Sequence, residues 1–178
     1  MQVTMARQGL LIVFTGNGKG KTTAALGMAL RAAGHGMRIL ILQFIKGSWR
    51  YGELNALERF PEIRIKPLGS GFTWKKDNLD EDRRLAHLGW QEAVEEMQRG
   101  TWDMIVLDEL NIILSYGLLP LDTVLAALRS RPSDLHVVVT GRNAPPELMA
   151  LADLATEMKL IKHPYHDQQL KAQQGIEF

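Results

Sequence analysis

One glycine- and lysine-rich segment limits what this chain can fold into more than any other feature. The segment reads Gly16, Asn17, Gly18, Lys19, Gly20, Lys21, Thr22, Thr23. It follows a strand-like apolar run at residues 10–14 and opens a helix-like run. Glycines let backbone N–H groups turn toward an anion, and a helix N-terminus adds further N–H groups and partial positive charge. The pattern therefore predicts a site for a nucleoside triphosphate.

Two side chains in this loop have a predicted role. Lys21 can reach the outer phosphates, and the Thr22 hydroxyl can bind magnesium. The general pattern has a glycine where Thr15 stands, whereas Lys19 adds a second cation. A glycine-rich turn that carries lysines by chance is the alternative. The order of strand, Gly-Lys-Thr and helix argues against that alternative.

Composition sets outer limits on the chain. Its 178 residues suit one domain, which we place at residues 9–178 after a short tail at residues 1–8. A net charge of +1 gives no reason to expect nucleic acid or an anionic membrane as partner. The absence of cysteine excludes disulfides and thiolate catalysis. The polar N-terminus is too short for a signal peptide, and no apolar run approaches the roughly 20 residues of a membrane helix. We therefore expect a cytoplasmic protein.

Strand-like and helix-like segments alternate along the chain. We predict strands at residues 10–14, 38–45, 62–66, 104–108, 135–140 and 155–161, with helices between them. The longest predicted helix spans residues 79–98, with Leu85, Leu88, Val94 and Met97 near helical spacing. Such alternation predicts an α/β fold with a mostly parallel sheet and helices on both faces. Ligands of such sheets bind at the carboxyl ends of the strands, which places Thr15, Asp108 and Thr140 along one rim.

A second motif is the acidic pair at the end of a buried strand. Asp108 and Glu109 follow four apolar residues, as expected of the acidic partner of a phosphate loop. Magnesium prefers oxygen ligands, so either carboxylate could bind it directly or through water. A solvated acidic turn is the alternative. Glu109 could orient a hydrolytic water or serve only as a metal ligand, and the motif alone leaves both open.

Several other residues are candidates for ligand contacts. Phe72 and Trp74 form an aromatic pair in a glycine-flanked loop, which suits a flat ligand or simply anchors the loop. Arg142 follows a buried strand and should reach the rim, where it could contact a phosphate or cap a helix. Lys46 stands near the end of another strand and could also reach a phosphate. Arg31 lies on the first helix, where a surface ion pair is the alternative.

Taken together, these segments resemble the ATP:corrinoid adenosyltransferases of the phosphate-loop type. The resemblance covers residues 9–178. The shared phrases stand at residues 12–25, 31–36, 43–47, 71–74, 106–110, 119–121, 131–132, 140–142, 151–153, 162–163 and 171–176. The Phe-Thr-Trp loop and the Lys-Ala-Gln-Gln-Gly-Ile ending at residues 171–176 are the most specific phrases. The Phe-Thr-Trp match favours a ligand-binding role for Phe72 and Trp74 over a role in anchoring the loop.

The resemblance implies a fold, a reaction and a set of partners. The fold is a single-domain P-loop NTPase-like (RecA-like) α/β domain, usually a homodimer. A cobalt(I) corrinoid attacks the 5′-carbon of ATP, and triphosphate leaves. ATP and the corrinoid are the substrates, Mg²⁺ or Mn²⁺ is the cofactor, and an electron donor reduces cobalt(II).

The resemblance also implies residue roles. Lys21 and Glu109 are the catalytic candidates. Residues 16–23 would hold the triphosphate. Thr22, Asp108 and Glu109 would hold the metal. The corrinoid candidates are Phe72, Trp74, Arg31 and Arg142.

Two other functions stay open at this point. An ordinary ATPase or kinase would act between phosphates, with Glu109 orienting water. A non-enzymatic protein would bind the corrinoid or the nucleotide without turnover. The products formed from ATP distinguish these classes.

Overall fold

A fully parallel sheet forms the centre of the structure, a computed structural model that describes residues 7–46, 52–69, 71 and 79–176. The strands are β1 (Leu11–Thr15), β2 (Ile39–Gln43), β3 (Ile63–Pro67), β4 (Met104–Asp108), β5 (His136–Thr140) and β6 (Leu154–Glu157). They lie in the order β3-β2-β4-β5-β1-β6, and every neighbouring pair is parallel. The predicted fold class is thereby confirmed.

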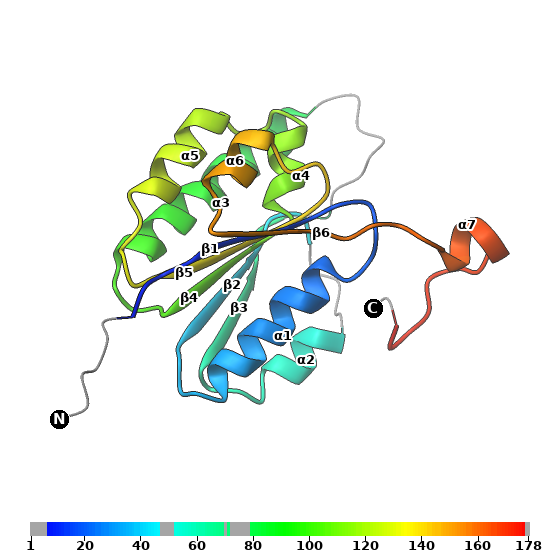
Figure 1. The fold of residues 1–178 in the computed structure, drawn as a ribbon, viewed down its shortest axis with the longest axis horizontal. Coiled ribbons are helices and arrows are strands. Elements are labelled where there is room, and N and C mark those ends of the chain that lie inside the picture. Colours follow the sequence, from blue (N-terminus) through cyan, green and yellow to red (C-terminus); the bar gives the residue numbers. More distant parts are fainter. Residues whose placement is uncertain (1–6, 47–51, 70, 72–78, 177–178) are drawn as a thin grey trace.

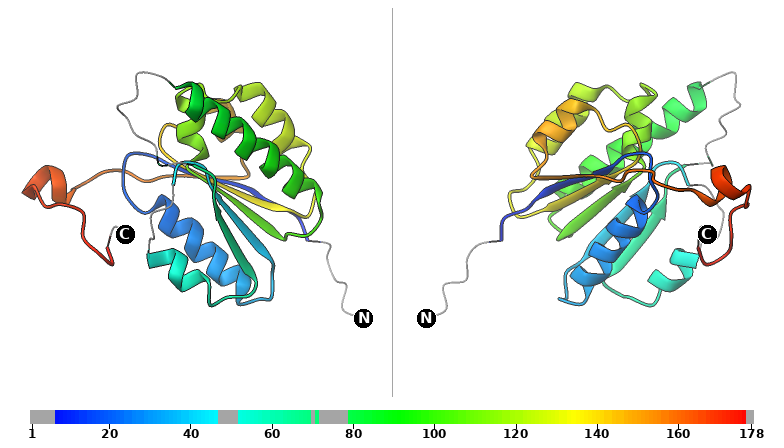
Figure 2. Two further views of the ribbon diagram at one scale, coloured as in Figure 1. Left: turned by 180° about the vertical axis from the view of Figure 1, so that it is seen from behind. Right: turned by 45° about the vertical axis from the view of Figure 1, so that its right-hand side comes forward.

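Helices cover both faces of this sheet (Figures 1 and 2). The helices are α1 (Lys21–Ala33), α2 (Gly52–Leu57), α3 (Asp80–Gln98), α4 (Leu110–Ser115), α5 (Leu121–Arg129), α6 (Pro146–Leu151) and α7 (Pro164–Gln168). α1 and α2 cover one face, and α3 to α6 cover the other. α7 lies beyond the β6 edge, away from both layers.

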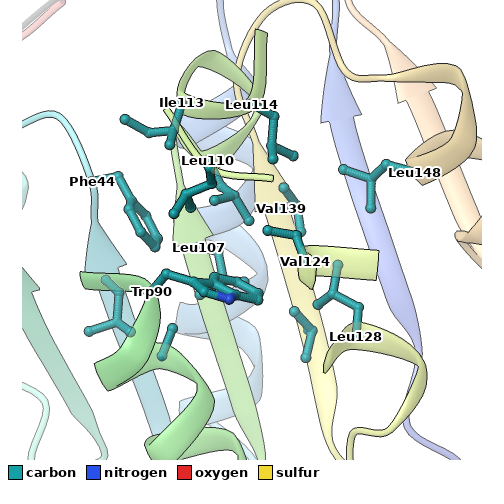
Figure 3. Packing of buried hydrophobic residues seen from close by; sticks show 14 of the residues in the cluster. Phe44, Trp90, Leu107, Leu110, Ile113, Leu114, Val124, Leu128, Val139 and Leu148 are labelled. Carbon is teal, nitrogen blue, oxygen red and sulfur yellow. The ribbon is translucent and has the colours of Figure 1, made fainter. Parts of the chain in front are cut away.

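The four inner strands, β2, β4, β5 and β1, are apolar and buried on both sides because each side packs under helices. On β1, Leu11 and Val13 point into the cluster beneath α3 to α6, whereas Ile12 and Phe14 point into the cluster beneath α1. Figure 3 shows the first cluster, with Trp90 of α3 between Leu107 of the sheet and the neighbouring helices. The two cores, one on each side of the sheet, hold the carboxyl ends of the strands together along one rim.

Most predicted elements are confirmed with bounds shifted by one to three residues. The strand predicted at residues 155–161 is shorter, because β6 ends at Glu157. Its neighbour in the sheet, β1, ends at Thr15 and continues into the glycine loop, so among the described residues no strand lies beside the chain after Glu157. The short helices α4 and α7 were not predicted. α4 (LNIILS) is apolar almost throughout, and so short a run shows no helical period.

The apolar face of α3 also differs from the prediction. Leu88 is 50% exposed, although its spacing suggested a core residue. The buried stripe passes through Ala86, Trp90, Ala93 and Met97, which confirms the predicted Met97. Val94, also predicted, is partly buried against this core. The spacing misplaces Leu88 because alanine and glycine on the buried face carry little hydrophobic signal.

Within the described residues, the N-terminal segment begins to contact the domain at Arg7. Arg7, predicted to lie in the tail, contacts the domain: its Nη1 pairs with Asp103 Oδ1 at 2.8 Å and its Nε donates to Asp134 O at 2.9 Å. Among the helices of the described residues, none has the length and apolar character needed to cross a bilayer.

The corrected face of α3 can be tested with two substitutions. We expect Met97→Ala to lower the free energy of unfolding by about 2–4 kcal/mol, because the 1%-exposed side chain leaves a cavity in the core. Leu88→Ala, on the same helix, should change it by less than about 0.5 kcal/mol. Urea titrations measure both values. A larger loss for Leu88→Ala would contradict this assignment of the faces.

Candidate active site

The predicted site residues meet at the carboxyl ends of the strands. A pocket of about 910 Å³ opens there between the N-terminal ends of α1 and α2, the end of β4 and residues 175–176. Its lining consists of Gly18, Lys19, Gly20, Lys21, Thr22, Thr23, Leu26, Lys46, Gly52, Glu53, Glu109, Ile112, Arg142, Gly175 and Ile176. The lining contains four basic side chains and two carboxylates, so its charge favours an anionic ligand.

The glycine loop needs its glycines for two physical reasons. Gly16 and Gly20 have φ values of 95° and 104°, which other residues rarely adopt. Gly18 does not, but a Cβ there would lie 2.7 Å from Met158 O. The Gly18 N–H donates to the same oxygen at 2.6 Å. The chain beyond β6 therefore forms one wall of the loop.

Lys21 is held inside this loop. Its side-chain Nζ donates to Gly16 O at 2.9 Å and to Gly18 O at 2.6 Å. An ammonium group has three hydrogens, so one is left for a phosphate oxygen. Burial lowers the pKa of Lys21, Glu109 opposes that shift, and the nearby Arg142 and Lys19 cations add to it. A bound polyphosphate would stabilise the charged ammonium.

Asp108 is completely buried and joins three parts of the rim. Its Oδ1 accepts hydrogen bonds from Thr22 Oγ1 at 2.9 Å and Thr140 Oγ1 at 2.7 Å. Its Oδ2 accepts one from Gln43 Nε2 at 3.1 Å. These bonds connect β4 to α1, β5 and β2. The carboxylate is thereby placed to orient the Thr22 hydroxyl.

Glu109 differs from its neighbour in both backbone and charge. Its φ of 65° is left-handed, which costs free energy for a residue other than glycine. Its N–H donates to Thr140 Oγ1 at 3.0 Å. Burial, and then the adjacent Asp108 charge, raise the pKa of Glu109 to about 7, although Lys21, Lys46 and Arg142 oppose this. Oε2 is buried, and within the described part of the chain it has no hydrogen-bond partner.

These groups fit a magnesium ion. The Thr22 hydroxyl and the Glu109 carboxylate line the same pocket, and oxygen ligands are those that Mg²⁺ prefers. The unsatisfied Glu109 Oε2 is the observation that favours a cation there. The described residues contain no cluster of three or more acidic or histidine ligands. Phosphate oxygens and water would therefore complete the coordination, as is usual for Mg²⁺ beside nucleotides.

The remaining predicted residues divide into three groups. Arg142 and Lys46 line the pocket, and Lys46 forms an ion pair with Glu53. Arg31 lies in the last turn of α1, at the opposite end from the loop, and does not line the pocket. Phe72 and Trp74 lie outside the described residues.

Residues that the sequence reading did not select also build the site. Asn111 is fully buried, and its Nδ2 donates to Gly141 O at 3.0 Å and Phe14 O at 3.4 Å. It thus joins the ends of β5 and β1. A single Asn within the apolar run of α4 was the signal that could have revealed it. Met158, against the loop, had no sequence signal, because the hydrogen bonds that it makes to the loop come from its backbone.

Fold and site together define a phosphate-loop nucleotide-binding domain of the P-loop NTPase type. The glycine loop joins β1 to α1, and the acidic pair ends β4, with β5 between the two strands. The solved structure of flagellar accessory protein FlaH from Methanocaldococcus jannaschii has the same kind of fold. It superimposes with a TM-score of 0.56 over 85% of this chain and 71% of that chain, at 11% identity.

Sequence comparison identifies the family. The model described as "ATP:corrinoid adenosyltransferase BtuR/CobO/CobP" matches residues 7–178. A corrinoid adenosyltransferase of Pseudomonas aeruginosa is 45% identical over 96% of this chain and 84% of its own. Corrinoid adenosyltransferase CobA of Salmonella typhimurium is 43% identical over 96% of this chain and 86% of its own. The chain therefore belongs to the ATP:corrinoid adenosyltransferase family.

The close approach of Gly18 to Met158 predicts the effect of one methyl group. We expect Gly18→Ala to weaken ATP binding roughly tenfold or more, because the loop must shift and misplace hydrogen bonds to charged phosphates, each contributing about 1.5–3 kcal/mol. Gly27→Ala on α1 is the matched control, since a Cβ there meets nothing within 4 Å. Isothermal titration calorimetry measures both variants. Equal affinities for Gly18→Ala and Gly27→Ala would count against this account of the loop.

The raised pKa of Glu109 predicts a pH-dependent cost to stability. A folded-state pKa of about 7, above the ordinary 4.5, means that the stabilising contribution is complete below pH 4.5 and lost as the pH rises through 7. We expect the neutral Glu109→Gln variant to gain about 1–3 kcal/mol over the parent at pH 8 relative to pH 4.5. Denaturant titrations at the two pH values, without nucleotide or metal, measure this difference.

Glu95→Gln, at an exposed position on α3, serves as the control for removing a carboxylate. It should show no comparable gain between the two pH values. A Glu109→Gln variant whose advantage did not increase with pH would show that the Glu109 carboxylate ionises at its ordinary pKa.

Proposed function

We propose that this protein transfers the 5′-deoxyadenosyl group of ATP to cobalt(I) of a corrinoid, in the biosynthesis or salvage of adenosylcobalamin. Cob(I)alamin and cob(I)yrinic acid a,c-diamide are the candidate acceptors. The observation that carries the proposal is the phosphate loop in a pocket that four basic side chains and Glu109 line, in a chain of this family.

The proposed reaction is a substitution at carbon. The cobalt(I) electron pair forms the cobalt–carbon bond to C5′ of ATP, and cobalt becomes formally cobalt(III). The bond from C5′ to the ester oxygen breaks, and triphosphate leaves with the electron pair. Because cobalt(I) is a strong nucleophile, no protein base has to activate it. Holding the two substrates in line is then a major part of catalysis.

The loop residues would stabilise the leaving triphosphate. Lys21 lies at the centre of the loop, and Lys19 and Arg142 line the same pocket. Their charges, together with the loop N–H groups other than that of Gly18, would oppose the charge that grows on the leaving oxygen. Such preorganised groups commonly contribute a few kcal/mol each. Because C5′ must face cobalt, the position of the corrinoid would decide which end of the triphosphate lies against Lys21.

Thr22 and Glu109 would hold the metal ion, with Asp108 orienting Thr22. Mg²⁺, or Mn²⁺ in its place, would supply positive charge that offsets the negative charge of the phosphate oxygens. Support comes from the hydrogen bond between Thr22 and Asp108 and from the unsatisfied Glu109 Oε2. Glu109, with a pKa of about 7, would release a proton when it binds the metal.

Phe72 and Trp74 would pack against the corrin and exclude the lower axial ligand, because cobalt without axial ligands is easier to reduce. An electron donor, acting on cobalt(II), is part of this proposal. Arg31 and Arg142 are the further candidates for corrinoid contacts, and of the two only Arg142 lines the pocket. These roles rest on the motif resemblance.

We also propose a cytoplasmic homodimer in which residues 9–178 act as one domain and residues 1–8 as a tail. ATP, the substrate, is made in the cytoplasm. Leu154 on edge strand β6 is 44% exposed, and Met149 on α6 is 36% exposed. Apolar side chains at a sheet edge favour a protein contact there.

The products formed with and without Lys21 test the proposal. Under strong reduction, the parent protein should yield intact triphosphate and the light-sensitive spectrum of an alkyl-cobalt corrinoid. Lys21→Ala should lower the rate at least about 100-fold, because the leaving group loses its central cation. Lys66→Ala is the control, since this lysine pairs with Glu92 on the surface and does not line the pocket. Chromatography of the phosphates and visible spectroscopy provide the readouts.

Two results would support the other classes of function. Release of ADP and phosphate at a useful rate, with no alkyl-cobalt product, would identify an ATPase in which Glu109 orients water. Tight binding of ATP with neither product would identify a binding protein. In either case the transferase proposal is rejected.

A further inference from the structure

The chain after β6 touches the pocket at both of its ends. We call residues 158–176 the C-terminal arm. At its start, the Met158 N–H donates to Thr15 O at 2.8 Å, and Met158 O accepts from the Gly18 N–H. The arm therefore begins as a backbone support for the phosphate loop.

The middle of the arm makes a turn that is held by local hydrogen bonds. His163 Nδ1 accepts from the Tyr165 N–H at 3.2 Å and caps α7, while the His163 N–H donates to Asp167 Oδ2 at 2.8 Å. α7 ends at Gln168, and the capping residue Gln169 has a left-handed φ of 56°. This reversal sends the chain back toward the domain, as Figures 1 and 2 show.

The returning segment comes back beside α1 and α2 (Figure 1). Gly175 and Ile176 belong to its lining, and Gly175 has a φ of 79° that favours glycine. The Ile176 side chain is 77% exposed. It joins Leu26 and Ile112 as an apolar part of a lining that is otherwise rich in charge.

We propose that Ile176 is a binding residue for the adenosine part of ATP. This inference rests on the proposed function, because it takes ATP as the occupant. The basic residues and the loop N–H groups suit the phosphates, whereas a purine ring needs apolar contacts. Because Ile176 is so exposed, a flat apolar ligand that covers it would remove much apolar surface from water, and this burial favours binding. The arm thus supports the phosphate loop at one end, through Met158, and would contact the base at the other end, through Ile176.

A matched pair of isoleucines tests this assignment. We expect Ile176→Ala in the full-length protein to weaken binding of a non-reactive ATP analogue about tenfold, because much of a buried side-chain contact is lost. Ile161→Ala should leave binding unchanged, since Ile161 is 75% exposed on the same arm but does not line the pocket. Calorimetry with Mg²⁺ present measures both variants.

Inorganic triphosphate is the second ligand in this experiment. Its affinity should be the same for the parent and both variants, because it has no base to contact Ile176. Unchanged binding of the ATP analogue by Ile176→Ala would overturn the proposal. So would an equal loss for triphosphate, which would indicate a disturbed loop, or a loss confined to the KM for corrinoid.

The binding measurements need no corrinoid and no turnover. If the protein binds the ATP analogue but never alkylates cobalt, the proposed function fails while the role of Ile176 is still decided. If transfer proceeds and Ile176→Ala binds like the parent, only the role of Ile176 fails.

Discussion

The buried Asp108 carboxylate is the interaction on which the rest of the site depends. It is completely removed from solvent, and it accepts hydrogen bonds from Thr22, Thr140 and Gln43. Burying a carboxylate costs free energy unless its lone pairs accept hydrogen bonds. The need to satisfy Asp108 therefore holds these three partners in place. One charge thus sets the relative positions of α1, β5 and β2 at the rim.

A second constraint acts from the other side of the phosphate loop. Asp108 holds the loop's threonine from the sheet, and the backbone of Met158 holds its glycines from outside. The loop is therefore fixed between a carboxylate and a carbonyl before any phosphate binds. Preorganised N–H groups of this kind need little rearrangement when charge develops on a ligand. Because Met158 begins the C-terminal arm, the same segment that supports the loop leads to Ile176 in the pocket wall.

Sequence reasoning recovered the elements whose signals are local. The glycine loop, the acidic strand end and the continuous apolar strands were each recognisable, because their chemistry lies within about ten residues. It misplaced Leu88 and overextended the last strand, since those outcomes depend on which helix face meets the sheet and on where β1 ends. It also missed Asn111, whose amide acts only because the ends of β1 and β5 lie beside α4.

By itself, the sequence determined the fold class, the phosphate loop and the family, because glycine positions, apolar runs and motif phrases are properties of neighbouring residues. Only the tertiary structure decided which groups share one site. It placed Lys46, Arg142 and Ile176 around the loop, and it left Arg31 at the far end of α1. It also separated the two acidic residues: Asp108 uses its oxygens within the protein, whereas Glu109 lines the pocket and has a carboxyl with a raised pKa. Burial and hydrogen bonds to distant residues cause this difference between Asp108 and Glu109, and two adjacent acidic residues in a sequence do not reveal either.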